Sequence, residues 1–363
     1  YRDGHTNYPP AHGVLPLREA VSGFIRDKLG LEYGPEDILI SGGSRPLIYA
    51  VYRTIVDPGE GVIYPVPSWN NNHYCHLSGA KPMEVMVHPD DNFMPSAQSL
   101  APFLEKAVLV SLCSPQNPTG TCFEKSKLLE ICENVLQENK RRKGVRKPLY
   151  ILYDQIYWQL CFGETEHYDP VGLVPELKDY VIYIDGISKS FASTGVRVGW
   201  AMGPGHIMAR MRAILSHVGA WAPKAEQMAT AWFLQDSGSV EQHMDSFRKA
   251  LSGRLSELYI GIMKLKDEGY PIDAIKPQGA IYLTVRFPWK KVTSSQSITF
   301  GDQASITQYL LETCQWAMVP FYAFGSDPES DWYRISVGTV KMEEIPEMLE
   351  KLKLGMQKWL NIG

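Results

Sequence analysis

The sequence lacks several features that would point to a membrane or a nucleic acid. No apolar run reaches the roughly 18 residues that a membrane-spanning helix needs, and no signal peptide opens the chain. Basic residues are not in excess either, because 36 Lys and Arg against 40 Asp and Glu give a formal net charge of −4. We therefore expect neither a membrane nor a nucleic acid as the main partner.

Cysteine motifs and metal-ligand clusters are also missing. The six cysteines form no Cys-x-x-Cys pair, which argues against zinc ribbons and redox motifs. Free thiols in a reducing compartment are the simpler reading, so we expect a cytoplasmic protein. His73 and His76 could pair on a metal, but no carboxylate or cysteine joins them at a ligand spacing. No metal site is expected.

What is present is the pattern of a two-domain α/β protein. The 363 residues are 44% hydrophobic and suffice for two domains of about 150 residues or more. Short apolar strands alternate with helical segments over the first two-thirds, which predicts a mainly parallel sheet covered on both faces. These strands are expected at 37–40, 61–64, 108–112, 149–153 and 180–184.

The pattern changes in the last third of the chain. A long amphipathic helix is expected from Ser239 to about Lys266, as a connector between domains. A strand over Ala280–Val285 and a polar stretch through Gln303 follow, and then a helix, a strand and a helix close the chain. We interpret this part as a smaller α+β domain.

Two unusual loops follow expected strands, and ligands in open α/β sheets bind beyond the carboxyl ends of the strands. The loop Ser41–Arg45 places Gly42 and Gly43 before a helix, so its backbone could approach a phosphate, although no P-loop lysine follows. The loop Ser114–Gly120 contains two prolines. Its Asn117 is either a local hydrogen-bonding residue of a turn or an amide that points at a ligand.

Charged residues follow two further strands. Asp154 ends an apolar strand, where it either caps a helix or meets a charged ligand. Lys189 lies just beyond the strand at 180–184 and eight residues before Arg197. A lone lysine is more often a surface residue, but in this position it could be a desolvated, nucleophilic amine.

Taken together, these segments resemble the class I/II aminotransferases, the fold-type I family of enzymes that depend on pyridoxal 5′-phosphate (PLP). The resemblance extends from about Asn7 to Gly338. The segments that match in order and approximate spacing are Tyr8–Gly13 with Leu17-Arg18, Gly42-Gly43-Ser44, Pro67-Ser68-Trp69, Asn117–Gly120, Asp154–Tyr157, Ser188-Lys189 with Gly195 and Arg197, Pro277–Tyr282, and Tyr333–Ser336.

The resemblance implies a fold and an activity. The fold is a large PLP-binding domain over residues 1–250, with a mainly parallel, seven-stranded sheet between helices, and a small α+β domain over residues 251–363. Part of the small domain is expected to be missing, because relatives usually carry some tens of residues before the equivalent of Tyr8. The activity is transfer of an amino group from an L-amino acid to a 2-oxo acid, by a ping-pong mechanism through a Lys189 aldimine.

The resemblance also implies a role for each matching residue. Lys189 corresponds to the lysine that binds PLP and shuttles a proton, and Asp154 to the partner of the pyridine nitrogen. Tyr157 and Asn117 correspond to donors to the phenolic oxygen of PLP, and Trp69 to the aromatic residue that stacks on its ring. Arg334 corresponds to the arginine that binds the substrate carboxylate. The expected phosphate-binding residues are Gly43, Ser44, Arg45, Ser188 and Arg197.

A homodimer with shared active sites is expected as well. In the family, the tyrosine that corresponds to Tyr8 reaches the phosphate of PLP in the other subunit. The prolines of Asn7-Tyr8-Pro9-Pro10 make this segment extended and stiff, which suits an arm that crosses an interface. An arm that packs on its own subunit is the alternative.

Some matters stay open at this point. Another PLP reaction on the same fold, by a lyase or an enzyme like aminocyclopropane-carboxylate synthase, is an alternative, as is a PLP-binding sensor domain. The segment Asn70–Asn72 is unusually polar for a place where the family often sets substrate specificity, or it is simply the solvated start of a helix. Glutamate and 2-oxoglutarate are the default substrates, although no specificity residue can be named.

Overall fold

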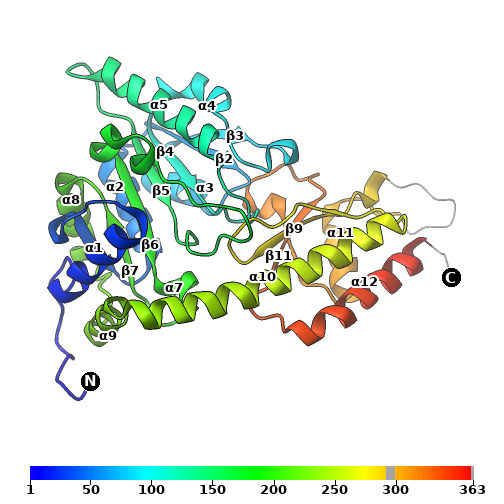
Figure 1. The fold of residues 1–363 in the computed structure, drawn as a ribbon. Helices are drawn as coiled ribbons and strands as arrows, with labels where there is room; N and C mark the ends of the chain where they lie inside the picture. Colours follow the sequence, from blue (N-terminus) through cyan, green and yellow to red (C-terminus); the bar gives the residue numbers. More distant parts are fainter. Residues whose placement is uncertain (292–298, 361–363) are drawn as a thin grey trace.

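A computed structural model describes residues 1–291 and 299–360 of the chain (Figure 1). Its centre is a seven-stranded sheet with the strand order β1-β7-β6-β5-β4-β2-β3. All neighbouring strands are parallel except β7, which is antiparallel to both β1 and β6. The strands are β1 (Ile38–Ser41), β2 (Gly61–Val66), β3 (Lys81–Met86), β4 (Ala107–Cys113), β5 (Tyr150–Asp154), β6 (Val181–Gly186) and β7 (Gly199–Met202).

Helices cover both faces of this sheet. Successive strand residues point to opposite faces, so Leu109 and Leu152 belong to one apolar cluster while Val110 and Ile151 belong to the other. The first cluster includes side chains of α2 (Ser44–Ile55), α3 (Asn71–Ser78) and α8 (Gly205–Val218). The second includes side chains of α1 (Leu15–Leu29), α4 (Ala97–Leu104), α5 (Lys125–Arg142), α9 (Lys224–Gln235) and α10 (Ser237–Asp267).

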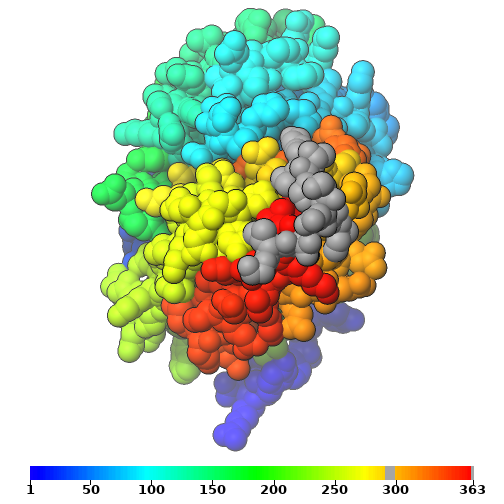
Figure 2. Space-filling model, turned by 90° about the vertical axis from the view of Figure 1, so that its right-hand side faces the viewer, coloured from blue at the N-terminus to red at the C-terminus, as the bar shows by residue number. Residues whose placement is uncertain are grey.

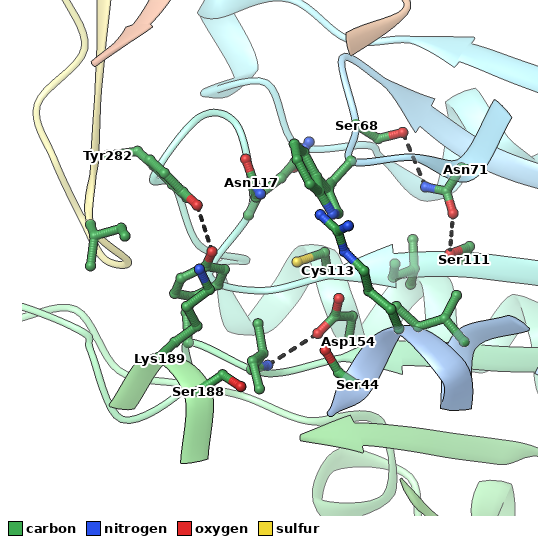
Figure 3. Close-up of a pocket in the computed structure, with 18 of the residues that line it drawn as sticks. Ser44, Ser68, Asn71, Ser111, Cys113, Asn117, Asp154, Ser188, Lys189 and Tyr282 are labelled. Carbon is green, nitrogen blue, oxygen red and sulfur yellow. Dashed lines mark hydrogen bonds between the residues drawn. The ribbon is translucent and has the colours of Figure 1, made fainter. Parts of the chain in front are cut away.

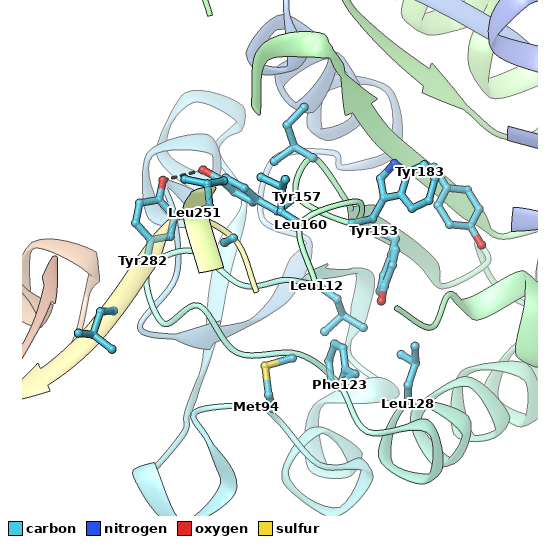
Figure 4. Close-up of a cluster of buried hydrophobic side chains, with 14 of the residues drawn as sticks. Met94, Leu112, Phe123, Leu128, Tyr153, Tyr157, Leu160, Tyr183, Leu251 and Tyr282 are labelled. Carbon is cyan, nitrogen blue, oxygen red and sulfur yellow. Dashed lines mark hydrogen bonds between the residues drawn. The ribbon is translucent and has the colours of Figure 1, made fainter. Parts of the chain in front are cut away.

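The second cluster extends to the carboxyl ends of the strands. Figure 4 shows Leu112, Tyr153 and Tyr183 of the sheet beside Leu128 of α5, with Tyr157 and Tyr282 at one edge of the same cluster. The phenol of Tyr153 donates a hydrogen bond to the carbonyl of Tyr168, at 2.6 Å, so its polar end is satisfied within the core. The apolar core therefore continues directly into the loops that follow β4 and β5.

A smaller antiparallel sheet lies beside the C-terminal part of α10, with the strand order β10-β11-β9-β8. Its strands are β8 (Asp273–Ala274), β9 (Tyr282–Arg286), β10 (Val319–Pro320) and β11 (Trp332–Ser336), and α11 (Gln303–Glu312) and α12 (Ile345–Leu360) accompany it. Figure 2 shows this end of the molecule, with α12 in red beside α10 in yellow. The single long helix α10 connects the two sheets.

Short helical segments join these elements. They are the α-helical turns α6 (Pro170–Leu173) and α7 (Ile187–Ser190) and the 3₁₀ helices η1 (Pro35–Asp37), η2 (Pro89–Asp91), η3 (Pro175–Asp179), η4 (Trp289–Lys291), η5 (Phe321–Phe324) and η6 (Met342–Glu344). None of the described helices is both long and apolar enough to cross a membrane.

The structure confirms the predicted α/β fold with a mainly parallel seven-stranded sheet and a second, smaller sheet. The five expected strands and the long helix are all present, but β3 and β7 were not expected. The predicted domain boundary at residue 250 falls inside α10, which continues to Asp267. The expected polar stretch before Gln303 includes residues 292–298, which lie outside the described residues.

Close backbone contact fixes the start of α2 against β7. Gly43 has a φ of 100°, a conformation that glycine adopts readily. A Cβ atom on Gly199 would lie 2.6 Å from the carbonyl carbon of Gly43 and 2.8 Å from the amide nitrogen of Ser44. Since both are backbone atoms, they cannot turn aside as a flexible side chain would. The loop between β1 and α2 is therefore seated directly on β7.

We predict that Gly199→Ala lowers the free energy of unfolding of the cofactor-free protein by about 1–3 kcal/mol, the usual cost of overpacking. Urea unfolding measures this change. Gly195→Ala is the matched control, because a Cβ atom on Gly195 meets no atom within 4 Å. Equal stability of the two variants would show that the contact with Gly43 and Ser44 is not tight.

Candidate active site

A cavity of about 570 Å³ opens where the carboxyl ends of the central strands meet the small sheet (Figure 3). Its polar and charged lining brings together most of the residues expected from the sequence. These are Ser44, Arg45, Trp69, Asn117, Asp154, Tyr157, Ser188, Lys189, Arg197 and Arg334. Gly43 does not line the cavity but precedes Ser44 at its edge.

Asp154 lies at the carboxyl end of β5, on the floor of the cavity. Its Oδ1 accepts a hydrogen bond from the backbone N–H of Ile156, at 3.1 Å. A short turn rather than an α-helix follows, so Asp154 is not a helix cap. Burial raises the pKa of Asp154 to about 6, while the N–H of Ile156 and the ammonium of Lys189 lower it. A cationic partner in the cavity would stabilise the anionic form.

Lys189 stands on the short helix α7, directly after β6. Its side chain is partly buried, and its Nζ lies 5.8 Å from the centre of the Tyr157 ring. Burial lowers the pKa of the Lys189 amine, and the guanidinium groups of Arg334 and Arg45 lower it further, while Asp154 raises it. The lysine therefore loses its proton more readily than a surface lysine does, which a nucleophilic amine requires.

Two hydrogen bonds join the loops of the large sheet to the small sheet above Lys189. The hydroxyls of Tyr157 and Tyr282 are 2.6 Å apart (Figures 3 and 4). The guanidinium of Arg334, on β11, donates from Nη1 to Oδ1 of Asn117 at 2.7 Å. Asn117 and Tyr157 are both buried, so each is held in one orientation within reach of the cavity.

Aromatic rings surround the Arg334 guanidinium. Its Cζ atom lies 4.6 Å from the ring centre of Tyr282, 4.7 Å from that of Phe324 and 5.7 Å from that of Trp69. Its Nε is buried and has no hydrogen-bond partner in the described part of the chain. Cation–π contacts stabilise such a charge without neutralising it, so the guanidinium is still able to bind an anion.

The loop before α2 and the loop before β7 meet at Arg197. This arginine has a φ of 60° and donates from Nη2 to the carbonyl of Gly42, at 2.9 Å, and from Nη1 to the carbonyl of Thr194, at 2.7 Å. A Cβ atom on Gly43 would lie only 2.1 Å from Nη2 of Arg197. Glycine at position 43 therefore makes room for the guanidinium beside Ser44.

Trp69 follows β2, and two cations lie over its ring. The Cζ atom of Arg45 is 5.3 Å from the ring centre, compared with 5.7 Å for Arg334. Arg45 is the second residue of α2, so the sequence places it next to Ser44. The expected stacking residue and an expected phosphate-binding residue thus contact each other directly.

The charges of the cavity are unbalanced. Its charged lining consists of Arg45, Lys189, Arg197 and Arg334 against Asp154 alone. None of the four cations forms an ion pair with a carboxylate among the described residues, although surface ion pairs are frequent elsewhere. No group of three or more potential metal ligands occurs in the part of the chain that is described. The cavity therefore fits a ligand with several negative charges.

Tyr8 is not among the residues that line the cavity. It is 83% exposed, and its ring packs edge-on against Trp221 with the centres 5.2 Å apart. The N-terminal arm that carries Tyr8 lies at the end of the molecule remote from the small sheet (Figure 1). Of the expected site residues, Tyr8 is the one that stands apart from the others.

The structure also adds residues that the sequence did not single out. Tyr282 pairs with Tyr157, and the buried Gln116 lines the cavity. Helix α3 begins at Asn71, as expected for a helix start, but Asn71 is buried while Asn72 is exposed. Tyr282 belongs to a segment that matched the family, so its position could have been read from the sequence. The burial of Asn71 could not.

Comparison with known proteins identifies the family of this chain. The model of the family "aminotransferase class I and II" matches residues 2–352. The aspartate aminotransferase of Bacillus subtilis is 28% identical over 98% of this chain and 85% of its own length. A bifunctional aspartate aminotransferase and glutamate/aspartate-prephenate aminotransferase of Petunia hybrida is 30% identical over 90% of this chain and 66% of its own length.

Solved structures are similar over nearly the whole chain. An aromatic aminotransferase of Pyrococcus horikoshii has a TM-score of 0.87 at 26% identity, covering 98% of this chain and 89% of the other. The aspartate aminotransferase of Thermus thermophilus with maleate has a TM-score of 0.85 at 25% identity, covering 98% and 85%. The chain therefore belongs to the class I and II aminotransferases, and it is a PLP-dependent transaminase.

Proposed function

We propose that the cavity holds PLP through Lys189 and that its other residues divide the work of binding cofactor and substrate. Lys189 is the partly buried amine with a lowered pKa, suited to bind the carbonyl carbon of PLP. Asp154 would pair with the pyridine nitrogen. Asn117 and Tyr157 would face the phenolic oxygen, and Trp69 would cover the ring.

The phosphate of PLP would lie at the start of α2. The backbone amides at a helix N-terminus favour a phosphate, and Arg197 lies against Gly42 and Gly43 at this point. Ser44, Arg45 and Ser188 line the same cavity. The unpaired positive charge here is the observation of this structure that best fits the cofactor.

The residues have distinct tasks during the reaction. When bound, PLP supplies a ring that accepts electrons from the Cα–H bond of an amino acid. Asp154 would keep a negative charge next to the pyridine nitrogen, so that this nitrogen retains its proton. Lys189 would take the proton from Cα as a general base and, as a general acid, deliver it to the cofactor carbon that carries the amino group. Arg334 would bind the α-carboxylate, and the aromatic rings around its guanidinium would hold that group in place.

We propose glutamate or aspartate as the amino donor and 2-oxoglutarate as the default acceptor. The names of two relatives support this choice. The relatives from Bacillus subtilis and Petunia hybrida carry aspartate and glutamate in their names.

A single experiment tests this function. The protein is loaded with PLP, and the 2-oxo acid formed from glutamate, aspartate, phenylalanine or leucine in the presence of an acceptor is measured. We expect the acidic amino acids to react faster than the other two. Borohydride reduction followed by peptide mapping should then locate the cofactor on Lys189.

Lys189→Ala is the control for this experiment. If the cofactor is still fixed to the variant protein after reduction, the assignment of Lys189 is wrong. Faster reaction of phenylalanine or leucine would overturn the proposed acidic donor while leaving amino transfer itself intact.

We predict that Asp154→Asn retains PLP but lowers kcat by about 10²- to 10⁴-fold, because the cofactor loses the negative charge beside its ring nitrogen. The asparagine is similar in shape, and its Oδ1 can still accept from the N–H of Ile156. Steady-state rates and the stoichiometry of bound PLP together check the prediction. Near-normal turnover would refute the role of Asp154.

We also propose that the protein is a cytoplasmic homodimer in which Tyr8 completes the active site of the other subunit. Tyr8 is highly exposed and stands outside its own cavity. Tyr8 packs on Trp221, and Trp232 on the next helix, α9, is also highly exposed. In a two-fold dimer each site would borrow one Tyr8 and each subunit would lend one.

The six free cysteines support the cytoplasmic part of this proposal, because free thiols suit a reducing compartment.

Mixed dimers test the shared site. Tyr8→Ala and Lys189→Ala are made separately, shown to be impaired, and then unfolded and refolded together. In a hybrid dimer one site carries both defects and the other carries neither, so activity should exceed that of either parent variant. If hybrids form but activity does not return, Tyr8 acts within its own subunit or not at all.

A further inference from the structure

The indole of Trp69 is held by ring contacts alone. Its side chain makes no hydrogen bond to the described residues and contacts Phe324, with ring centres 6.0 Å apart, as well as Arg45 and Arg334. Such contacts are individually weak, so they restrain the tilt of a ring less than a hydrogen bond would. The position of the indole therefore depends strongly on the backbone that carries it.

The segment immediately before Trp69 is held at three points, two on its backbone and one on the side chain of Ser68. Nε2 of Gln116 donates to the carbonyl of Pro67 at 2.9 Å. The amide N–H of Ser68 donates to the carbonyl of Phe324 at 3.1 Å. The hydroxyl of Ser68 accepts a hydrogen bond from Nδ2 of Asn71 at 3.0 Å. The first two contacts come from neighbouring loops, whereas the third comes from the helix start that follows Trp69.

Asn71 is itself fixed from two further elements. Its Oδ1 accepts from the phenol of Tyr52, on α2, at 2.9 Å and from the hydroxyl of Ser111, on β4, also at 2.9 Å. All three partners of Asn71 are buried, and Figure 3 shows Asn71 between Ser68 and Ser111. The amide thus joins α2 and β4 to the segment before Trp69.

An asparagine suits this position because it supplies both kinds of hydrogen-bonding group without a charge. The hydroxyls of Tyr52 and Ser111 donate to its oxygen, and its NH2 group donates to the hydroxyl of Ser68. A carboxylate would bring a buried negative charge, and an apolar side chain would supply neither group. Asn70 and Asn72 are not equivalent, since no side-chain hydrogen bond of either is present among the described contacts and Asn72 is exposed.

We propose that Asn71 is a positioning residue that fixes Trp69 at the wall of the cavity. The inference rests on the proposed function, in which Trp69 covers the ring of PLP. It assigns a task to the polar segment after Trp69. Within that segment Asn72 is exposed, whereas Asn71 is buried and ties the stacking residue to the central sheet and to α2.

A double-mutant cycle separates this role from a general structural one. The variants are Asn71→Ala, Trp69→Phe and the two combined, with Asn72→Ala as the matched control on the exposed side of the same turn. We expect Asn71→Ala to lower kcat/KM and PLP affinity by about tenfold or more, since several buried hydrogen bonds are lost. In the Trp69→Phe background the same change should cost less than about threefold.

Hydrogen exchange of the cofactor-free protein provides a measurement that does not depend on enzyme activity. The amide of Ser68 should exchange faster in Asn71→Ala than in the wild-type protein or in Asn72→Ala. Ser68→Ala serves in case Asn71→Ala does not fold. It removes the acceptor of the Asn71 NH2 group and retains the bonds of Asn71 to Tyr52 and Ser111, so it too should speed the exchange of the amide at position 68.

The outcomes are distinguishable. If the effects of Asn71→Ala and Trp69→Phe multiply, or if exchange at Ser68 is unchanged, Asn71 does not position Trp69 and the proposal is wrong. If the wild-type protein neither binds PLP nor transfers amino groups, the proposed function fails instead. In that event exchange at Ser68 alone decides whether Asn71 fixes the segment.

Discussion

Unpaired positive charge in a partly enclosed cavity is the feature on which the other parts of this site depend. Arg45, Lys189, Arg197 and Arg334 face one another across about 570 Å³ with Asp154 as their single carboxylate. Lys189 and Arg334 are partly buried, so less water screens their charges, and like charges repel. The lowered pKa of Lys189 is one result. The protein has to stabilise the guanidinium groups without neutralising them, because a neutralised site would not attract anions.

Two different kinds of contact stabilise the guanidinium groups without neutralising them. Arg334 is surrounded by the rings of Tyr282, Phe324 and Trp69, whose faces attract a cation but bring no formal charge. Arg197 instead donates to the carbonyls of Gly42 and Thr194. In both cases the charge itself remains available. The glycine at position 43 follows from the second kind of contact, because a backbone that approaches a guanidinium this closely has no room for a side chain.

Much of this arrangement could be read from the sequence, and what could not be read has identifiable causes. The strands that were expected are continuously apolar, because both of their faces are buried. Strand β3 was missed because it lies at the edge of the sheet and is half exposed, so its residues alternate with polar ones. Strand β7 has only four residues and begins with a glycine, and it looked like the end of a loop.

The site residues likewise fall into those that could be expected from the sequence and those that could not. Asp154, Lys189 and Arg334 could be expected to share a cavity because their surroundings matched a family. The burial of Asn71 could not, since three consecutive asparagines look alike in sequence and only the packing of α2 and β4 distinguishes the middle one. The partnership of Tyr157 with Tyr282 is likewise a long-range pairing across 125 residues. Hydrophobic periodicity has no information about such contacts.

The cross-sheet hydrogen bonds have a consequence for how the site works. Arg334 and Tyr282 belong to the small sheet, whereas Asn117 and Tyr157 follow strands of the large one. A third contact of this kind, from the hydroxyl of Thr284 to the carbonyl of Thr119, is buried and 2.9 Å long. The distance from Lys189 to the guanidinium that would bind a substrate carboxylate is therefore set by the fit between two sheets. The segment before Trp69 joins the two parts of the molecule in the same way, since it is bonded to Phe324 and, through Asn71, to α2 and β4. The group that would bind the substrate and the ring that would cover the cofactor are thus both fixed by contacts that cross between the two sheets.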